Sequence, residues 1–187
     1  GISRPATQQE VVRNSSKMLT FIDLAGHEHY LKTTIFGMTG ALPDYGMLML
    51  GANMGVQRMT KEHLGIALAL NLPFFLVVTK IDIAPAHILK QTMKKMRGIL
   101  KSRNVGKLPF RVKNMGDVLS VVKSIHGGRV VPVFRVSNVT GEGLDLLKAF
   151  LNLLPGLRNV QSTRQTPAEF FVDDHFTVPG VGTVVAG

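Results

Sequence analysis

The stretch FFLVVTKID, residues 74–82, decides the fold, because a run of large apolar residues ends abruptly in a polar cluster. Aromatic and β-branched residues favour strands, and a run without polar alternation indicates a strand buried on both faces. Two similar runs, MLMLGA (47–52) and VVPVFRVS (130–137), predict further buried strands. The run MLTFID (18–23) predicts one more strand, the first of the four in chain order, which ends at an aspartate.

Helix-length patterns separate these runs. Apolar residues recur at helical spacing from about Pro85 to Ser102, and again over LDLLKAFLNLL (144–154). Other helices are expected from Thr60, as an N-cap, to Asn71, over 115–124, and over 29–42 where glycines interrupt the pattern. Strands that alternate with helices and are apolar on both faces predict an α/β fold with a doubly wound, mostly parallel sheet. Ligands of such sheets bind beyond the carboxyl ends of the strands.

Composition shifts predict the domain boundaries. Residues 1–17 are polar and are interpreted as a tail or the remnant of a switch region, and 18–155 as the α/β domain. A polar linker is expected over 156–167. The last stretch, 168–187, contains EFFVDDHFTVPGVGTVVAG and is interpreted as the start of a second, all-β domain.

The bulk composition favours an intracellular protein with a polyanionic partner. The net charge is +10, from 22 Lys and Arg against 12 Asp and Glu, and the chain has no cysteine. Such a balance suits RNA, although a solvated basic face is the alternative, and the lack of cysteine favours a reducing compartment such as the cytoplasm. The most apolar run, residues 64–78, is too short to cross a bilayer, so no membrane association is expected.

Polar clusters follow three of the predicted strands. After the first, Asp23 can hold magnesium, and Gly26 lets a backbone N–H approach a phosphate. After FFLVV, the Asp82 carboxylate can accept two parallel N–H bonds from guanine, which adenine cannot offer, while the Lys80 stem can lie over the base. After the fourth strand, backbone N–H groups of the loop 137–141 can meet the guanine carbonyl. Each cluster alone is also ordinary turn or N-cap chemistry.

The three clusters together are more specific than any one of them. DLAGH (23–27) matches D-x-x-G-H, TKID (79–82) stands where N-K-x-D is expected, and SNVTGEGL (137–144) matches the S-A-x loop. In this order and on these elements, the sequence resembles the GTP-binding domain of translational GTPases related to elongation factor Tu. Within that family, DLAGHEHYLKTTIFGMTG and TKEHLGIALALN are most similar to the GTP-binding protein 1 and 2 subfamily.

The resemblance implies a GTP-hydrolysing switch that uses GTP or GDP and Mg²⁺ and acts with the ribosome, RNA or RNA-processing factors. Asp23 would hold magnesium through water, the Gly26 amide would sense the γ-phosphate, and His27 would position the attacking water. Guanine would be held by the side chains of Lys80 and Asp82. The loop of Ser137, Asn138 and Val139 would close over the base, and the segment from Gly26 to about Gly40 would be a mobile switch.

The sequence also departs from the family pattern. The phosphate loop G-x-x-x-x-G-K-[ST] does not occur in these 187 residues, and Thr79 replaces the asparagine that would tie its loop to the phosphate loop. The sheet is therefore expected to lack a middle strand. A partner chain, including a second copy, would fill the gap, or the remaining strands would pack differently. We expect this chain alone to bind GTP weakly and to hydrolyse it barely or not at all.

Two other interpretations stay open at this stage. The protein could be a non-catalytic RNA-binding or regulatory module that keeps the shell of the domain. The row His27, Glu28 and His29 could also hold zinc, although further ligands from other histidines would be needed without a recognisable spacing.

Overall fold

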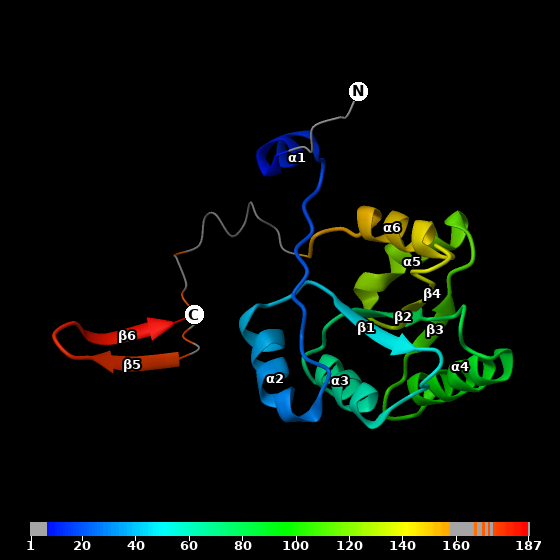
Figure 1. Ribbon diagram of the computed structural model, residues 1–187, viewed down its shortest axis with the longest axis horizontal. Helices are drawn as coiled ribbons and strands as arrows, with labels where there is room; N and C mark the ends of the chain where they lie inside the picture. The colour runs from blue at the N-terminus through cyan, green and yellow to red at the C-terminus, as the bar shows by residue number, and fades with distance from the viewer. Residues whose placement is uncertain (1–6, 158–166, 168–169, 171, 173, 187) are drawn as a thin grey trace.

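A computed structural model describes residues 7–157, 167, 170, 172 and 174–186 (Figure 1). The elements in chain order are α1 (Gln8–Asn14), the 3-10 helix η1 (Glu28–Tyr30), α2 (Leu31–Gly40), β1 (Gly46–Gly51), α3 (Arg58–Ala69), β2 (Phe74–Thr79), α4 (Ala86–Lys101), β3 (Leu108–Arg111), α5 (Met115–Ser124), the 3-10 helix η2 (Ile125–Gly127), β4 (Val130–Arg135), α6 (Leu144–Leu153), β5 (Asp174–Val178) and β6 (Gly182–Ala186). None of the described helices is both long enough and apolar enough to cross a membrane.

The first four strands form one parallel sheet in the order β1-β2-β4-β3. Leu76 of β2 lies opposite Leu48 of β1 on one side and Val133 of β4 on the other. Figure 1 shows α3 and α4 on one face of this sheet and α5 and α6 on the other. The α/β, doubly wound, parallel arrangement predicted from the sequence is therefore confirmed.

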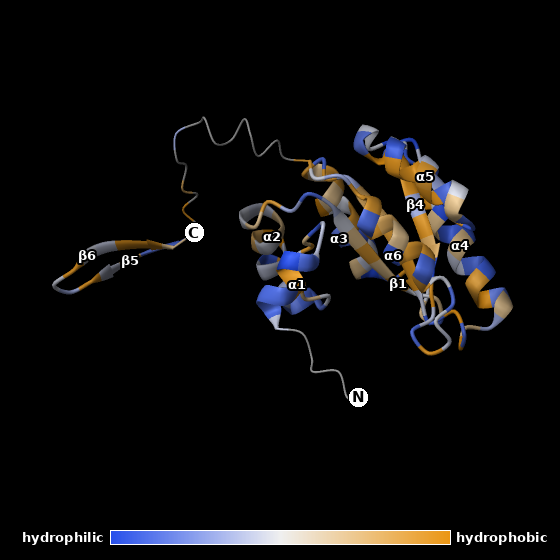
Figure 2. Ribbon diagram, turned by 90° about the horizontal axis from the view of Figure 1, so that it is seen from above, coloured by the Kyte–Doolittle hydropathy of each residue, from blue (hydrophilic) through white to orange (hydrophobic). Residues whose placement is uncertain are grey.

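The strand β2 lies at the centre of the hydrophobic core. Its alternate side chains point to opposite faces, as the strand geometry requires. Phe74, Leu76 and Val78 join the cluster that packs under α3 and α4, whereas Phe75 and Val77 join the cluster under α5 and α6. This two-sided burial explains why FFLVV has no polar alternation, and Figure 2 shows hydrophobic colours along much of the neighbouring strands β1 and β4.

The predicted strand over 18–23 is wrong. Residues 17–26 form no helix or strand, and the side chains of Phe21 and Ile22 are 64% and 45% exposed. A strand in a sheet needs a neighbour to satisfy its backbone groups. In the described part of the chain, β1 forms the edge of the sheet and pairs only with β2, so residues 18–23 have no strand beside them. Among the described strands the sheet β1-β2-β4-β3 is continuous, so the missing middle strand, altered packing and self-association stay predictions.

Three further expectations need correction. The exposed helix α1, which begins with a capping box of Thr7 and Glu10, lies where no helix was predicted, and the interpretation of 1–17 as a tail or switch-region remnant stays a prediction. The helix expected from Thr60 begins at Arg58 with Gln57 as its N-cap, so Thr60 is a buried helical residue. The strand β3 lies in the basic segment where no strand was predicted, and it pairs with β4 at the edge of the sheet.

Lys17 fastens the N-terminal segment to the sheet domain. Its Nζ donates hydrogen bonds to the carbonyl oxygens of Leu151, at 2.8 Å, of Asn152, at 3.2 Å, and of Leu154. These carbonyls belong to the last turn of α6 and to its C-cap Leu154, where the helix itself provides no N–H partner. Tyr45 adds a bond of 2.8 Å from its hydroxyl to the carbonyl of Pro155.

The C-terminal stretch contains the antiparallel hairpin of β5 and β6, with Phe176 opposite Val184. This pairing agrees with the tight-turned strands expected there. The assignment of residues 168–187 to a β-barrel domain stays a prediction, and most of the expected linker 156–167 lies outside the described residues.

Candidate functional site

The loop after β2 turns sharply, and the turn exposes Asp82. The carbonyl of Thr79 still accepts a hydrogen bond from the Ala52 N–H at 2.9 Å, so the sheet continues to this point. Lys80 then adopts a left-handed conformation with φ of 59°, which is uncommon for a residue with a side chain. The next side chain, Ile81, is buried in the core under α3 and α4. Lys80 and Asp82 on either side of it are exposed and accessible to a ligand.

The loop after β4 is organised by Ser137, whose side chain is fully buried. Its Oγ accepts hydrogen bonds from the N–H groups of Val139, at 3.2 Å, and Thr140, at 3.1 Å. Its own N–H donates to the carbonyl of Glu142 at 3.0 Å. The loop is therefore held by a buried hydroxyl, while Asn138 and Val139 lie exposed at its tip.

Gly143 is a structural residue of this loop that the sequence analysis missed. Its φ is 75°, and a Cβ placed there would lie 2.0 Å from the carbonyl oxygen of Arg135. Only glycine lets the chain pass so close to the end of β4 before α6 begins. The second glycine of TGEG was the available sequence signal for this contact.

The sheet places these two loops next to each other. Val78 lies opposite Arg135, and the Val136 N–H donates to the Val78 carbonyl at 2.8 Å. The pairing therefore continues to within two residues of Lys80 and one residue of Ser137. One edge of the parallel sheet presents an exposed carboxylate beside a rigid loop of backbone amides, and this arrangement suits a planar base with adjacent N–H donors and a carbonyl acceptor.

The remaining polar cluster, Asp23 to His27, packs against α2 and does not follow a strand. Thr34 of α2 donates its hydroxyl hydrogen to the Ala25 carbonyl at 2.7 Å. Leu24 packs against Gly37, where an added Cβ would lie 2.4 Å from the Leu24 side chain. Asp23 and Gly26, on either side of these anchors, are exposed. The segment that resembles a γ-phosphate switch is thus held by a helix and has no strand of its own.

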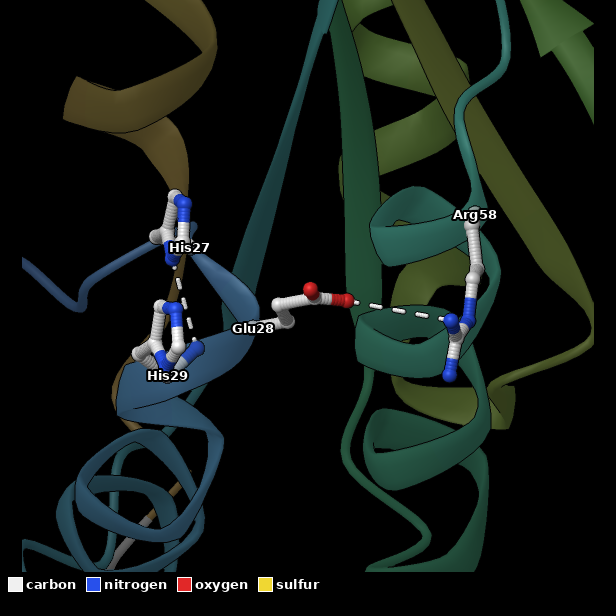
Figure 3. Close-up of polar contacts among 4 residues, drawn as sticks. All are labelled: His27, Glu28, His29 and Arg58. Atoms are coloured by element: carbon white, nitrogen blue, oxygen red, sulfur yellow. Dashed lines mark hydrogen bonds and ion pairs between the residues drawn. The ribbon is translucent and has the colours of Figure 1, made fainter.

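His27 caps the 3-10 helix η1 (Figure 3). Its Nδ1 accepts a hydrogen bond from the His29 backbone N–H at 3.3 Å. The two imidazole rings are stacked, with 4.9 Å between their centroids. Because Nδ1 is the acceptor, the neutral ring carries its proton on Nε2. Glu28 points away from both histidines and forms an exposed ion pair of 3.7 Å with Arg58 at the start of α3. The ring therefore has a fixed tautomer on an exposed turn.

The structure brings together only some of the predicted site residues. Thr79, Lys80 and Asp82 adjoin the loop of Ser137, Asn138 and Val139. Within the described ranges, no hydrogen bond or ion pair joins Asp23, Gly26 or His27 to either loop. Asp23 offers one exposed carboxylate, which fits a water-mediated contact to Mg²⁺ but does not by itself define a metal site. Among the described residues, no group of three or more His, Asp or Glu side chains is placed to hold a metal ion, so the zinc interpretation lacks its further ligands.

A parallel sheet with two adjacent polar loops at its carboxyl edge is typical of nucleotide-binding α/β domains. Residues 1–156 match the family described as "Elongation factor Tu GTP binding domain". The chain belongs to this family, and the resemblance seen in its three motifs is confirmed.

Known relatives agree with this assignment. GTP-binding protein 1 of Xenopus laevis is 57% identical over 178 residues, which cover 95% of this chain and 27% of that protein. GTP-binding protein 2 of Homo sapiens is 46% identical over 185 residues, covering 97% and 31% of the two chains. The chain thus spans about a third or less of the length of these relatives. A crystal structure of a bacterial selenocysteine-specific elongation factor matches with a TM-score of 0.54 at 24% identity, covering 85% of this chain and 23% of that one, and supports the fold.

Replacing Ser137 tests whether its hydroxyl holds the loop. In Ser137→Ala, two loop N–H groups lose their acceptor, and we expect the free energy of unfolding to fall by about 1–3 kcal/mol. Asn138→Ala is the matched control, because Asn138 is the exposed neighbour and a surface substitution usually changes stability by less than about 0.5 kcal/mol. Urea denaturation of the two variants measures the difference. Equal stabilities would show that the loop does not depend on the hydroxyl.

Proposed function

We propose that the protein, in a form that also supplies a phosphate-binding loop, is a GTP-binding and GTP-hydrolysing switch of the translational GTPase type. It acts in the cytoplasm with the ribosome, RNA or RNA-processing factors. The observation that carries the proposal is the adjacency of the Asp82 carboxylate and the Ser137 loop at one edge of the parallel sheet. The names of its relatives and of its family support the same conclusion.

Base recognition is the part of this function for which the chain provides the residues. Asp82 would accept two N–H bonds from the Watson–Crick edge of guanine, and the Lys80 stem would cover one face of the base. The backbone N–H of Asn138 would donate to the guanine carbonyl, and Val139, whose N–H is held by the Ser137 hydroxyl, would help to close the loop over the base. Adenine presents an amino group where guanine presents that carbonyl, so both loops would disfavour it.

Hydrolysis is assigned to the exposed segment Asp23–His27. Mg²⁺, held by Asp23 through water, would neutralise the charge of the β- and γ-phosphates. The Gly26 N–H would contact the γ-phosphate, and His27 would orient the attacking water, for which a defined tautomer is an advantage. Since this segment rests on α2, it would have to move toward the nucleotide when GTP binds. This chain alone is expected to hydrolyse GTP barely or not at all.

Asp82→Asn tests the base assignment. In a form of the protein with a phosphate-binding loop, we expect the affinity for GTP to fall about thirtyfold or more, because a charge-assisted pair of hydrogen bonds worth about 2–3 kcal/mol is lost. The affinity for ATP should stay low and unchanged. Calorimetry with both nucleotides measures this, and Asp145→Asn on α6 controls for the loss of an exposed charge. An unaltered preference for GTP would refute the assignment.

His27→Ala tests the catalytic assignment. We expect kcat for GTP hydrolysis to fall about a hundredfold or more, because a group that positions or activates the nucleophile contributes on that order. The affinity for GTP should change little, since His27 would act on water and not on the base. Single-turnover hydrolysis and nucleotide binding separate the two effects. His87→Ala, an exposed histidine on α4, is the control, and an equal loss of kcat in both variants would contradict the role of His27.

A further inference from the structure

A second surface stands out for its charge, outside the two loops and the Asp23 segment. Between Asp82 and Asp117 the sequence contains no carboxylate. The same segment carries nine cations, which are Lys90, Lys94, Lys95, Arg97, Lys101, Arg103, Lys107, Arg111 and Lys113. The chain as a whole has 12 acidic residues for its 22 Lys and Arg, so this segment concentrates the positive charge. It forms α4, β3 and their connection.

Four of these cations form a straight row on α4. Lys90, Lys94, Arg97 and Lys101 follow one another at spacings of four, three and four residues, and all four are exposed. This spacing places them on one side of the helix. At about 1.5 Å per residue, the row is about 16 Å long with one cation in each turn. We name these four residues the basic stripe.

The edge strand β3 extends the basic stripe. The helix α4 packs against β3, and Arg97 and Arg111 line the same small depression between them. Arg111 is also close enough to Arg135 to act on it. Burial lowers the pKa of the Arg135 guanidinium, the charge of Arg111 lowers this pKa further, and Glu142 opposes the effect. Positive charges therefore crowd this side of the sheet.

No described carboxylate forms an ion pair with a member of the basic stripe. Among the described residues the recorded ion pair is Arg58 with Glu28, which lies elsewhere, so no member of the basic stripe is paired. Like charges four residues apart on a helix, such as Lys90 and Lys94, are destabilising. A bound polyanion would remove this repulsion and would gain from the release of its counterions.

The chemistry of the surface favours RNA over a protein or a membrane. Every residue of α4 is described, and none of its large apolar side chains is exposed. Protein interfaces have an apolar core, and helices that lie on membranes bury an apolar face. The blue segments along α4 in Figure 2 show its hydrophilic side. Phosphates in a row need only cations at regular intervals, and double-helical RNA is recognised largely through its backbone and shape.

We propose that the basic stripe, extended by Arg111, binds the phosphate backbone of double-helical RNA without reading its sequence. The inference specifies the RNA partner of the proposed function, but it rests on this surface alone. The two proposals can be tested separately. A loss of RNA binding would leave the GTPase assignment intact, and a failure of the GTPase assignment would leave RNA binding by this surface intact.

The test compares two triple variants of the 187-residue chain. One is Lys90→Ala, Lys94→Ala and Lys101→Ala in the basic stripe. The control is Lys61→Ala, Lys123→Ala and Lys148→Ala, which removes the same charge from exposed positions on α3, α5 and α6. Alanine favours helices, so both variants should fold, and circular dichroism verifies this.

Binding of a labelled RNA duplex of about 20 base pairs, followed by fluorescence anisotropy at several KCl concentrations, is the measurement. We expect the stripe variant to bind about tenfold or more weakly at low salt. Its slope of log affinity against log salt should fall by about 2.7, because each of three lost phosphate contacts contributes about 0.9. The control variant should keep most of the affinity and of the slope.

Three results would overturn the proposal. Equal weakening of both variants would show a response to net charge alone, and no weakening of either would remove the basic stripe from RNA binding. Competition by polyglutamate as effective as that of unlabelled RNA, at equal charge, would indicate an acidic protein partner in place of RNA.

Discussion

The parallel pairing of β2 with both β1 and β4 is the constraint on which the rest of the structure depends. Its hydrogen bonds satisfy both edges of a strand whose side chains are buried on both faces, so β2 is fixed from all sides. Because parallel strands end at the same edge, the loop of Lys80 and Asp82 must emerge beside the loop of Ser137. The candidate base-binding site is thus a consequence of sheet geometry, and it needs no contact from the N-terminal segment.

The segment with Asp23 and His27 lacks such support. It is held by the hydrogen bond from Thr34, by the packing of Leu24 and by the hydrogen bonds from Lys17 to the end of α6. All of these are side-chain contacts, and none is the backbone pairing of a strand. The apolar side chains of residues 18–22 remain exposed in consequence. The two halves of the proposed site therefore differ in how firmly they are held: the half proposed to bind the base is anchored by the sheet, and the half proposed to contact the phosphates is not. A switch needs mobility in the second half.

The sequence predicted those elements whose signal is local. The apolar runs FFLVV, MLML and VVPVF predicted buried strands. The glycine, serine and aspartate residues that follow these runs predicted the loops at the strand ends. The strand β3 was missed because LPFR is short, contains Pro109 and lies at an edge. The helix α1 was missed because its only signal was the capping box of Thr7 and Glu10. The strand predicted over 18–23 was wrong because a local pattern cannot show whether a neighbouring strand is present. The packing of the Asp23 segment against α2 could not be predicted from local sequence either, because it depends on contacts with Thr34 and Gly37.

Amide hydrogen exchange of the 187-residue chain, resolved by residue, tests the central claim that the two halves of the site have different foundations. We predict that the amides of Leu76–Val78 and of Val131, Val133 and Phe134 exchange slowly, near the limit set by global unfolding. Those of Leu19–Asp23 should exchange at rates close to an unstructured chain. Protection of residues 19–23 as strong as that of β2 would contradict the account, because it would show a paired strand where we find an exposed segment.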